Sequence, residues 1–346
     1  MFHLFEKIKN NDVYVIAEMS ANHGGKLDTA LQIVREAAQA GADCVKIQTY
    51  TADSITIDCD NEYFKIKGGL WDGYKLYDLY SEAGTPYEWH KAIKDECDKC
   101  GVDFLSTPFD PMAVDFLEGL GVEAYKIASF ELNDIPLIEY AASKGKTMIM
   151  SCGMATIEDI QDAVDACHRV GNNGIVLLKC CSEYPANWED MHLGNISDMR
   201  KRFGVHVGIS DHSFGSLGAV VAVSLGAQVI EKHVKIDGVD SADSAFSMKM
   251  EDFAKMVQDA KNAKLIAKGP DYTLSVKEQS STVFRRSLFA IKDIEIGDEI
   301  TNENVRSIRP SDGISPKYLK DMIGKKAKSS LKYGQPITKK FFDELG

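Results

Sequence analysis

The sequence predicts an α/β protein in which a parallel (β/α)8 TIM barrel is followed by a small β-rich domain. Between residues 13 and 236, eight short runs of apolar and β-branched residues recur, and a stretch with helical periodicity follows each run. Continuous apolar strands that alternate with helices form parallel sheets buried on both faces. Eight such units in about 250 residues match a closed barrel. An open, doubly wound sheet is the alternative, but no G-x-G-x-x-G follows the first run.

The predicted strands are short and rich in valine, isoleucine and leucine. They span residues 13–20, 43–50, 102–108, 124–129, 147–153, 174–185, 205–213 and 229–236. Most segments between them place an apolar residue at every third or fourth position, as helices with one buried face do, and several end in glycine. These helical stretches cover residues 27–42, 85–101, 113–121, 135–145, 156–171, 199–204, 215–227 and 250–269. We therefore expect the barrel over residues 1–268.

Residues 51–84 interrupt the alternation of strands and helices. The segment is long for a connection between a strand and a helix and is rich in aromatic residues, which favours a lid or a substrate-binding wall over a plain loop. After the barrel, residues 269–283 are polar and lack helical periodicity, so we expect a linker there. Residues 284–346 place glycine turns between short runs, as in DIEIGDEIT and SLKYGQPIT, and predict a small β-rich accessory domain.

Charge and cysteine content exclude several classes of protein. The chain has 40 Lys+Arg and 52 Asp+Glu, a net charge of −12, which argues against binding to nucleic acid or to an anionic membrane. No apolar run is long enough to cross a bilayer, and the first residues lack a signal-peptide pattern. Eight cysteines are too few for a disulfide scaffold, and the C-x-x-C pair Cys97 and Cys100 has no second pair at zinc spacing. We expect a reduced cytoplasmic protein.

Polar residues lie at the ends of most predicted strands. Because the active site of a (β/α)8 barrel lies at the carboxyl ends of its strands, we expect these side chains to meet at one mouth. Helix caps and rim positions are an alternative for some of them, but not for the whole set. The candidates are Glu18, Asn22, His23, Lys46, Gln48, Ser106, Thr107, Lys126, Ser129, Glu131, Ser151, Ser182, Tyr184, Ser210, Asp211, His212, Glu231 and His233.

Two of these candidates are histidines at the ends of the seventh and eighth predicted strands. Side chains at the ends of neighbouring strands can share a ligand, and neutral imidazole binds Mn, Fe, Co or Zn. His212 and His233 are therefore candidate ligands of a divalent metal. The alternative is structural, with His212 beside a helix cap and His233 as a core histidine whose hydrogen bonds are satisfied.

Two lysines lie within otherwise apolar strands. A buried ammonium group is costly unless it meets an anion, so Lys46 and Lys126, with the serines at neighbouring strand ends, predict a cradle for a phosphate or carboxylate. Lys126 could instead form a Schiff base, as in class I aldolases, or either lysine could extend to the rim. Glu18, Glu131 and Glu231 are candidate acids and bases, with ion pairs to the lysines as the alternative. Burial between apolar neighbours would raise the pKa of Glu18.

A series of motifs resembles the sialic acid synthase family. The motifs are IAEMSANHGG, GADCVKIQTY, DFLSTPFD, YKIASFELNDIPLI, MIMSCGMAT, GISDHSFG, VIEKHV and IRPSDGISP, and they extend over nearly the whole chain. The C-terminal segment resembles the antifreeze-like (SAF, β-clip) domain of those enzymes. Within the family, S-A-N-H after the first glutamate, FKIKGGLWDGYKLYDLYSEAGTPYEWH and VDSADSAFSM resemble the pseudaminic acid synthase branch.

The resemblance implies a transferase that condenses phosphoenolpyruvate with an open-chain amino sugar, giving a nine-carbon 2-keto acid and phosphate. The branch implies that the sugar is 2,4-diacetamido-2,4,6-trideoxy-altropyranose (6-deoxy-AltdiNAc), and the alternatives are N-acetylneuraminate or legionaminate synthesis. A divalent metal is also implied, typically manganese with magnesium or cobalt as alternatives, and so is a domain-swapped homodimer. A Schiff-base aldolase and an inactive carbohydrate-binding protein are the competing classes.

Matched position by position, the family's motifs imply a role for each candidate. His212 and His233 would hold the metal, and the catalytic residues would be Glu18, Glu131 and Glu231. Phosphoenolpyruvate would be bound by Lys46, Thr107, Lys126, Ser129, Ser151, Ser182 and Ser210. The sugar would be bound by Asn22, Gln48, Tyr184, Asp243 and, from a partner chain, Arg309. At the phosphate site, Cys152 and Ser182 depart from residues that are common in relatives.

Overall fold

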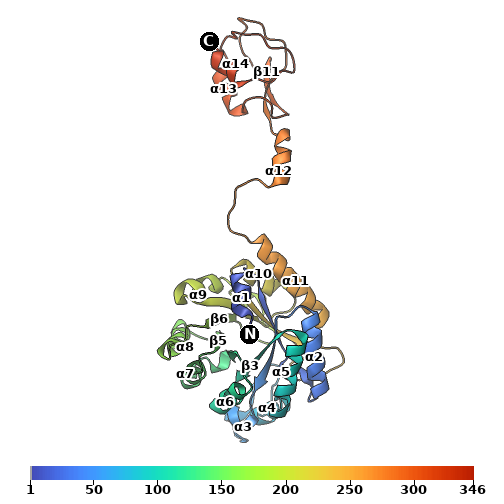
Figure 1. Ribbon diagram of the computed structural model, residues 1–346, viewed down its shortest axis with the longest axis vertical. Coiled ribbons are helices and arrows are strands. Elements are labelled where there is room, and N and C mark those ends of the chain that lie inside the picture. The colour runs from blue at the N-terminus through green and yellow to red at the C-terminus, as the bar shows by residue number, and fades with distance from the viewer. Residues whose placement is uncertain (1) are drawn as a thin grey trace. The chain divides into compact units, whose positions relative to one another are not determined.

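A computed structural model describes residues 2–346 of the chain. The chain divides into two compact units, Met1–Lys268 and Gly269–Gly346. In the first unit, helices surround a parallel sheet that curves into a nearly closed eight-stranded barrel (Figure 1). The predicted α/β barrel is confirmed.

The barrel strands follow the order β3-β2-β1-β8-β7-β6-β5-β4, every hydrogen-bonded pair is parallel, and β3 packs beside β4. A short further strand, β9 (Met248–Lys249), pairs with β8. The eight strands are β1 (Tyr14–Glu18), β2 (Cys44–Thr49), β3 (Asp103–Pro108), β4 (Ala124–Ile127), β5 (Thr147–Ser151), β6 (Ile175–Cys180), β7 (His206–Asp211) and β8 (Val229–Lys235). Each lies within one of the predicted runs.

Eight helices cover the outside of the barrel, and side-chain caps start several of them. Asp110, Asp134 and Thr156 each accept a hydrogen bond from a backbone N–H in the first turn of the helix that follows. The helices are α2 (Leu27–Gln39), α5 (His90–Cys100), α6 (Pro111–Gly119), α7 (Ile135–Ser143), α8 (Ile157–Arg169), α9 (Asn195–Phe203), α10 (Leu217–Ser224) and α11 (Met250–Ile266).

Alternation along the strands divides the barrel interior into an apolar floor and a polar mouth. Successive side chains point to opposite faces of a strand, so every second residue enters the lumen. The floor, at the amino ends of the strands, is packed by Tyr14, Ile16, Cys44, Leu105, Ala124, Ile149, Val176, Leu178 and Val229. Leu4 of the short helix α1 (Leu4–Lys9) joins this cluster. Two residues beyond the floor, the lumen positions are polar, as in Glu18 and Lys46.

The 51–84 segment forms two short helices that the sequence did not predict. They are α3 (Ala52–Ile55) and α4 (Leu76–Ala83), with a 3-10 turn η2 (Glu62–Phe64) between them. The α3 helix starts with a capping box in which Thr51 and Ser54 satisfy each other's backbone N–H groups. Leu79 of α4 is buried, so the segment packs against the rest of the barrel unit.

The second unit has a small core of its own. Its antiparallel strands β10 (Ser287–Ala290) and β11 (Val305–Ile308) are extended by single bridges, and short helices α13 (Leu319–Met322) and α14 (Lys339–Glu344) complete it. The core residues include Leu288, Ile294, Ile300, Val305, Met322, Ile337 and Phe341. The small β-containing domain is confirmed.

The expected linker, residues 269–283, contains a helix that apolar periodicity did not indicate. Helix α12 (Val276–Ser281) forms there and is followed by the 3-10 turn η6 (Thr282–Phe284). A capping box starts the helix, since Ser275 and Glu278 bond each other's backbone N–H groups. This S-x-x-E pattern was the signal in the sequence, whereas apolar periodicity is absent because no residue of α12 is buried.

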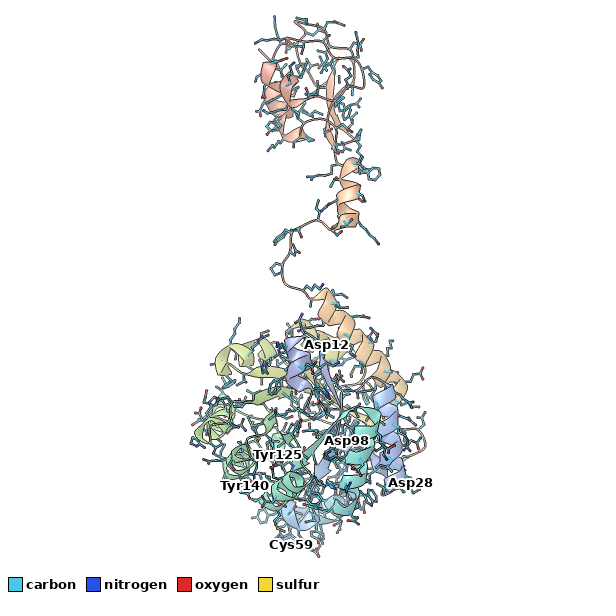
Figure 2. All side chains as sticks on the ribbon, in the orientation of Figure 1. Asp12, Asp28, Cys59, Asp98, Tyr125 and Tyr140 are labelled. Carbon is cyan, nitrogen blue, oxygen red and sulfur yellow. The ribbon has the colours of Figure 1, made fainter. Side chains whose placement is uncertain are left out.

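Two further expectations concern membranes and cysteines. Within residues 2–346, no helix is long and apolar enough to cross a membrane. All eight cysteines are free, including Cys97 and Cys100 in and at the end of α5. Cys59, in the 51–84 segment, lies at the periphery of the barrel unit (Figure 2).

Candidate active site

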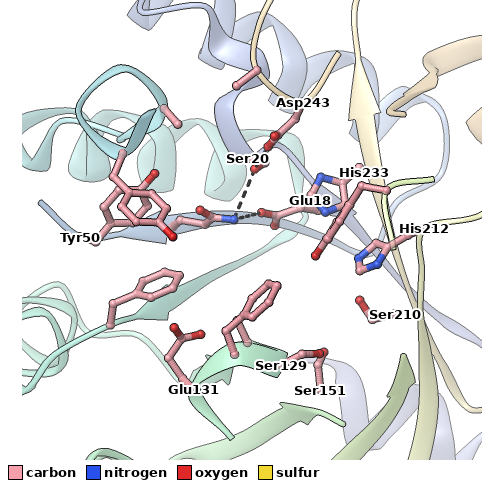
Figure 3. A pocket seen from close by; sticks show the side chains of 18 of the residues that line it. Glu18, Ser20, Tyr50, Ser129, Glu131, Ser151, Ser210, His212, His233 and Asp243 are labelled. Carbon is pink, nitrogen blue, oxygen red and sulfur yellow. Dashed lines mark hydrogen bonds between the residues drawn. The ribbon is translucent and has the colours of Figure 1, made fainter. Parts of the chain in front are cut away.

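A cavity of about 240 Å³ opens at the carboxyl ends of the barrel strands (Figure 3). Most of the predicted site residues line it, because alternation brings the last lumen-facing residue of each strand to the same mouth. The predicted residues in its lining are Glu18, Lys46, Gln48, Lys126, Ser129, Glu131, Ser151, Tyr184, Ser210, His212, Glu231, His233 and Asp243.

The two lysines enter the cavity from β2 and β4, and both meet carboxyl groups. The Nζ atom of Lys46 lies 2.8 Å from Oε2 of Glu18 and 3.8 Å from Oε1 of Glu231. The Nζ atom of Lys126 lies 3.6 Å from Oε2 of Glu231. All four side chains are buried. The ion pairs considered as an alternative for Glu18 and Glu231 are thus present, and they lie at the centre of the predicted substrate site.

Burial and mutual charge set the protonation of this cluster. Burial raises the pKa of Glu18 to about 7, although Lys46 opposes the shift. Burial also acts on Glu231, but Lys126 and Lys46 outweigh it and hold the pKa of Glu231 below its usual value. Burial lowers the pKa of Lys126. Glu18 therefore can exchange a proton near neutral pH, whereas Glu231 stays ionised.

One hydroxyl group contacts Lys126, and two others lie around Gly153. Its Nζ atom donates a 2.7 Å hydrogen bond to Oγ of Ser151, and Oγ of Ser129 accepts a 3.1 Å hydrogen bond from the backbone N–H of Gly153. A side chain at Gly153 would collide with the hydroxyl groups of Ser129 and Ser182, so the backbone can approach them only because this residue is glycine. An ammonium group among hydroxyl groups is a setting that binds phosphate or carboxylate oxygens.

The two predicted metal ligands lie side by side in the cavity (Figure 3), with 5.4 Å between their ring centroids. His212 donates a 2.8 Å hydrogen bond from Nδ1 to the carbonyl of Cys181, which leaves Nε2 as the basic nitrogen of the neutral ring. Nδ1 of His233 is buried and has no hydrogen-bond partner. Burial, followed by the positive charges around it, lowers the pKa of His233 well below its usual value.

These observations fit a divalent metal. An orphaned buried nitrogen is costly unless something binds it, and neutral imidazole is the form that coordinates metals. Within residues 2–346, no group of three or more His, Cys, Asp or Glu side chains is arranged to hold a metal ion. The two histidines could therefore supply only part of a coordination shell.

Two predicted residues lie next to the cavity lining but outside it. Thr107 accepts a 3.3 Å hydrogen bond from Lys46, so it orients the ammonium group from below. Asn22 donates from Nδ2 to the carbonyl of Val234, at 2.9 Å, and to Oγ of Ser247, at 2.8 Å. It therefore ties the end of β8 to the loop that carries Asp243, and it does so away from the cavity.

Two other predicted site residues, Ser182 and Arg309, do not line the cavity either. Oγ of Ser182 lies 3.7 Å from Sγ of Cys180, at the end of β6, and does not line the cavity. Arg309 belongs to the second unit, where it lines a polar pocket together with Arg285 and Arg286.

A hydrogen-bonded chain on one side of the cavity contains a residue that the sequence analysis missed (Figure 3). Gln48 donates from Nε2 to Oε1 of Glu18, at 3.2 Å, and to Oγ of Ser20, at 3.3 Å. Ser20 in turn donates to Oδ2 of Asp243. Ser20 starts the turn η1 (Ser20–His23) two residues after Glu18, and this spacing was its only signal. Glu131 lies across the cavity from this chain.

The sequence predicted a lid or substrate-binding wall from residues 51–84, but not the individual side chains that form the aromatic outer wall of the cavity. The ring of Trp71 lies 6.0 Å from that of Tyr184 and 6.3 Å from that of Phe246, and its Nε1 donates a 3.2 Å hydrogen bond to the carbonyl of Ala242. The 51–84 segment contributes Ile55, Ile66, Trp71, Leu79, Tyr80 and Ala83 to the lining. The remaining apolar lining includes Tyr50, Phe109, Phe130 and Phe246. Their signal was the aromatic content of the insertion and of the residues just after the strands.

The replacement Glu131→Gln is expected to change how stability depends on pH. Burial raises the pKa of Glu131 from 4.5 to about 7, so the folded protein retains a proton that the unfolded chain releases between these values. This group's contribution to the free energy of unfolding is present at low pH and is lost as pH rises through about 7. Urea denaturation at pH 5 and pH 8 should show that Glu131→Gln removes about 2–3 kcal/mol of the fall between them.

The exposed Glu158→Gln variant is the matched control, and its fall should equal that of the parent. Equal pH dependence of the parent and Glu131→Gln would contradict the shift.

Comparisons with known proteins identify the family of the chain. A model of the NeuB family matches residues 33–271, and a model of the SAF domain matches residues 285–343. The chain is 45% identical to the pseudaminic acid synthase of Campylobacter jejuni over 326 residues, which are 94% of this chain and 95% of the relative. It is 31% identical to the N,N'-diacetyllegionaminic acid synthase of Legionella pneumophila over 334 residues, 94% of this chain and 93% of the relative.

A solved structure resembles the chain as well. It is the N-acetylneuraminic acid synthetase of Leptospira borgpetersenii in complex with citrate, with a TM-score of 0.70, 31% identity, and coverage of 78% of this chain and 90% of that one. The family model covers more than half of the chain, and the SAF domain follows it as the motifs implied. From the barrel, the cavity and these matches together, it follows that this chain belongs to the NeuB family.

Proposed function

We propose that this protein catalyses the reaction of pseudaminic acid synthases. It would condense phosphoenolpyruvate with 6-deoxy-AltdiNAc to a nine-carbon 2-keto sugar acid and release phosphate. The observation that carries the proposal is the convergence of two buried lysines and two buried histidines on one cavity, in a chain that is 45% identical to a pseudaminic acid synthase. An inactive carbohydrate-binding protein would need neither pair.

Phosphoenolpyruvate fits the lysine end of the cavity. It carries about three negative charges near neutral pH, and charge-assisted hydrogen bonds from ammonium and hydroxyl groups are the strongest that a protein offers to such a ligand. Lys46 and Lys126 supply the charge, Ser151 supplies a hydroxyl group in contact with Lys126, and Ser129 supplies another from the cavity lining. Glu231 stays ionised between the lysines, so its role is to orient their ammonium groups.

Two carboxyl groups can donate and accept the protons that the reaction transfers. C3 of the enol attacks the aldehyde carbon, whose oxygen gains a proton; water adds at C2 and loses a proton; cleavage of the C2–O bond releases phosphate. Glu18 and Glu131 both have pKa values raised to about 7 by burial, and they flank the cavity from opposite sides. A carboxyl group with such a pKa can donate or accept a proton near neutral pH.

The paired histidines are the proposed metal ligands, and we propose manganese. A divalent metal bound there supplies Lewis-acid polarisation of the aldehyde oxygen. Because two protein ligands leave most of the coordination shell open, substrate or water oxygens would complete it.

The apolar character of the aromatic wall favours a trideoxy sugar as the substrate. 6-Deoxy-AltdiNAc has a methyl group at C6 and two acetamido methyl groups, whereas N-acetylmannosamine has hydroxyl groups at C4 and C6. Trp71, Tyr184 and Phe246 form an apolar surface that gains by contact with methyl groups and leaves added hydroxyl groups unpaired. Between the two trideoxy sugars, support for the pseudaminic acid reaction comes from identity of 45% against 31%.

Truncation of the wall is expected to weaken sugar use selectively. Trp71→Ala removes the indole ring beside Tyr184, so the KM for the sugar should rise about 10- to 100-fold. The KM for phosphoenolpyruvate should stay within about twofold, because the lysines that bind it are unchanged. Steady-state phosphate release with each substrate varied in turn measures both values. Tyr63→Ala, 91% exposed in the same segment, is the control; equal loss for both substrates would contradict a wall that contacts the sugar.

A panel of sugars tests the function as a whole. The protein is incubated with phosphoenolpyruvate and either 6-deoxy-AltdiNAc, its manno-configured 2,4-diacetamido analogue or N-acetylmannosamine, with and without manganese, and products are identified by mass spectrometry and NMR. We expect a nine-carbon product from the first sugar, dependent on the metal. If the protein turns over N-acetylmannosamine alone, N-acetylneuraminate synthesis would replace the proposal. If it turns over the manno analogue alone, legionaminate synthesis would replace it.

The remaining parts of the proposal concern assembly and location. The family resemblance implies a domain-swapped homodimer in which Arg309 of one chain completes the sugar site of another, and we propose this arrangement. We also propose that the protein acts in the cytoplasm, where phosphoenolpyruvate is produced.

A further inference from the structure

A second buried ion pair lies directly behind the two histidines. On β7, Asp211 precedes His212, and on β8, Lys232 precedes His233. Because successive side chains of a strand point to opposite faces, Asp211 and Lys232 point away from the cavity when the histidines point into it. The two residues are also partners in the register of β7 and β8.

The pair is tightly connected. Nζ of Lys232 lies 2.9 Å from Oδ2 of Asp211 and also donates to the carbonyl of Ser213. Oδ1 of Asp211 accepts hydrogen bonds from the backbone N–H of Ser213, at 2.9 Å, and from its Oγ, at 2.7 Å. The side chains of Lys232 and Asp211 are 2% and 0% exposed. Both neighbours of His212 in the chain are therefore tied to the residue that precedes His233.

The helix layer leaves this network little freedom to move. A Cβ atom placed on Gly218 of α10 would lie 3.0 Å from Oδ2 of Asp211 and 2.9 Å from Oγ of Ser213. The glycine therefore lets the helix pack directly against the ion pair, and a shift of the carboxylate toward α10 would meet the backbone of that helix.

Stability alone is a weak reason for such a pair. Removing two charges from water costs several kcal/mol per ion, and replacing a buried ion pair by apolar groups of similar size is often neutral or stabilising. A network of fixed hydrogen bonds instead defines geometry, and groups that orient metal ligands from behind change metal affinity by about 10- to 100-fold when removed.

We infer that Asp211 and Lys232 are positioning residues that fix the spacing and direction of His212 and His233. This inference rests on the proposed role of the histidines as metal ligands. The ion pair joins the last residue of β7 to the middle of β8, on the face opposite the cavity.

The test replaces both members, so that no buried charge is left without a partner. Asp211→Asn combined with Lys232→Met is expected to fold with a Tm close to that of the parent and to bind Mn²⁺ at least about tenfold more weakly. Binding to metal-stripped protein is measured by calorimetry and by the EPR signal of free Mn²⁺. At saturating Mn²⁺ the variant should regain most of the parent's kcat.

The control is an ion pair at the other end of the barrel. Lys7 lies 2.9 Å from Asp43, just before β2, and Lys7→Met combined with Asp43→Asn should leave Mn²⁺ affinity unchanged. If the Asp211/Lys232 variant does not fold, Ser213→Ala removes one hydrogen bond of the network and is expected to weaken Mn²⁺ binding about two- to fivefold.

Parent-like Mn²⁺ affinity in the folded double variant, or in Ser213→Ala where that variant is used, would overturn the positioning role and leave the proposed function standing. The parent and His233→Ala are measured alongside. If the parent binds no Mn²⁺, the metal role of the histidines fails and the inference with it.

Discussion

Replacing His233 by alanine is expected to abolish metal-dependent turnover and to leave the fold intact. Its Nδ1 atom is buried in the cavity without a hydrogen-bond partner, so the substitution removes a proposed metal ligand and breaks no hydrogen bond of that atom. Lewis-acid assistance is worth several kcal/mol, so kcat should fall by at least about a thousandfold. Phosphate release over a range of Mn²⁺ concentrations measures the loss.

His168→Ala is the matched control, because His168 is an exposed histidine in the last turn of α8. It should retain the parent's rate at every Mn²⁺ concentration. Circular dichroism and thermal unfolding of His233→Ala should resemble those of the parent. Full activity of His233→Ala would remove the metal assignment, whereas loss of the folded state would move the test to His233→Gln, which keeps a polar side chain of similar reach.

The second large effect is expected for Lys126→Met. Lys126 lies 3.6 Å from Glu231 and 2.7 Å from Ser151, so its loss removes a proposed phosphoenolpyruvate ligand and one of the two lysines that pair with Glu231. Removing one partner of a buried charge pair costs about 2–5 kcal/mol, which predicts a fall of about 30- to 5,000-fold in kcat/KM for phosphoenolpyruvate. Steady-state kinetics at saturating sugar measure it, with the exposed Lys255→Met as control.

The same lysine separates two mechanisms. Burial lowers the pKa of Lys126, a property that a Schiff-base aldolase also requires. In the proposed mechanism Lys126 binds an anion and forms no covalent bond, so pyruvate and borohydride should leave the mass of the protein unchanged. Covalent trapping on Lys126, together with activity that resists EDTA, would establish the aldolase instead.

Much of the barrel could be predicted because its signals are local. Each strand is a short apolar run, and the neighbouring helices repeat apolar residues every three or four positions. Two of the segments that were missed, α12 and α3, lack this signal. Helix α12 has no buried residue, and α3 has four residues. Such elements depend on capping hydrogen bonds, as at Ser275 and Thr51, which apolar periodicity does not detect.

In the candidate site, too, the residues with a local sequence signal could be predicted and those without one could not. Glu18, Lys46 and His233 could be identified because each is a polar residue near the carboxyl end of an apolar strand. Ser20 and Trp71 could not, since one lies in a turn after β1 and the other in an irregular segment. Their side chains reach the cavity through the path of the backbone between elements, and a period of two or 3.6 residues carries no information about that path.

Which face of a strand each residue occupies follows from the order of residues along the chain, because alternation is a property of every strand. The sequence by itself therefore determines which residues lie on the apolar floor and which charged residues lie at the mouth. The pairing of charges is not. Lys46 meets Glu18 and Glu231, and Asp211 meets Lys232, because parallel strands bring residues far apart in the chain into one register. Coulomb energy falls with distance, so only the folded barrel determines which charges interact and which pKa values shift.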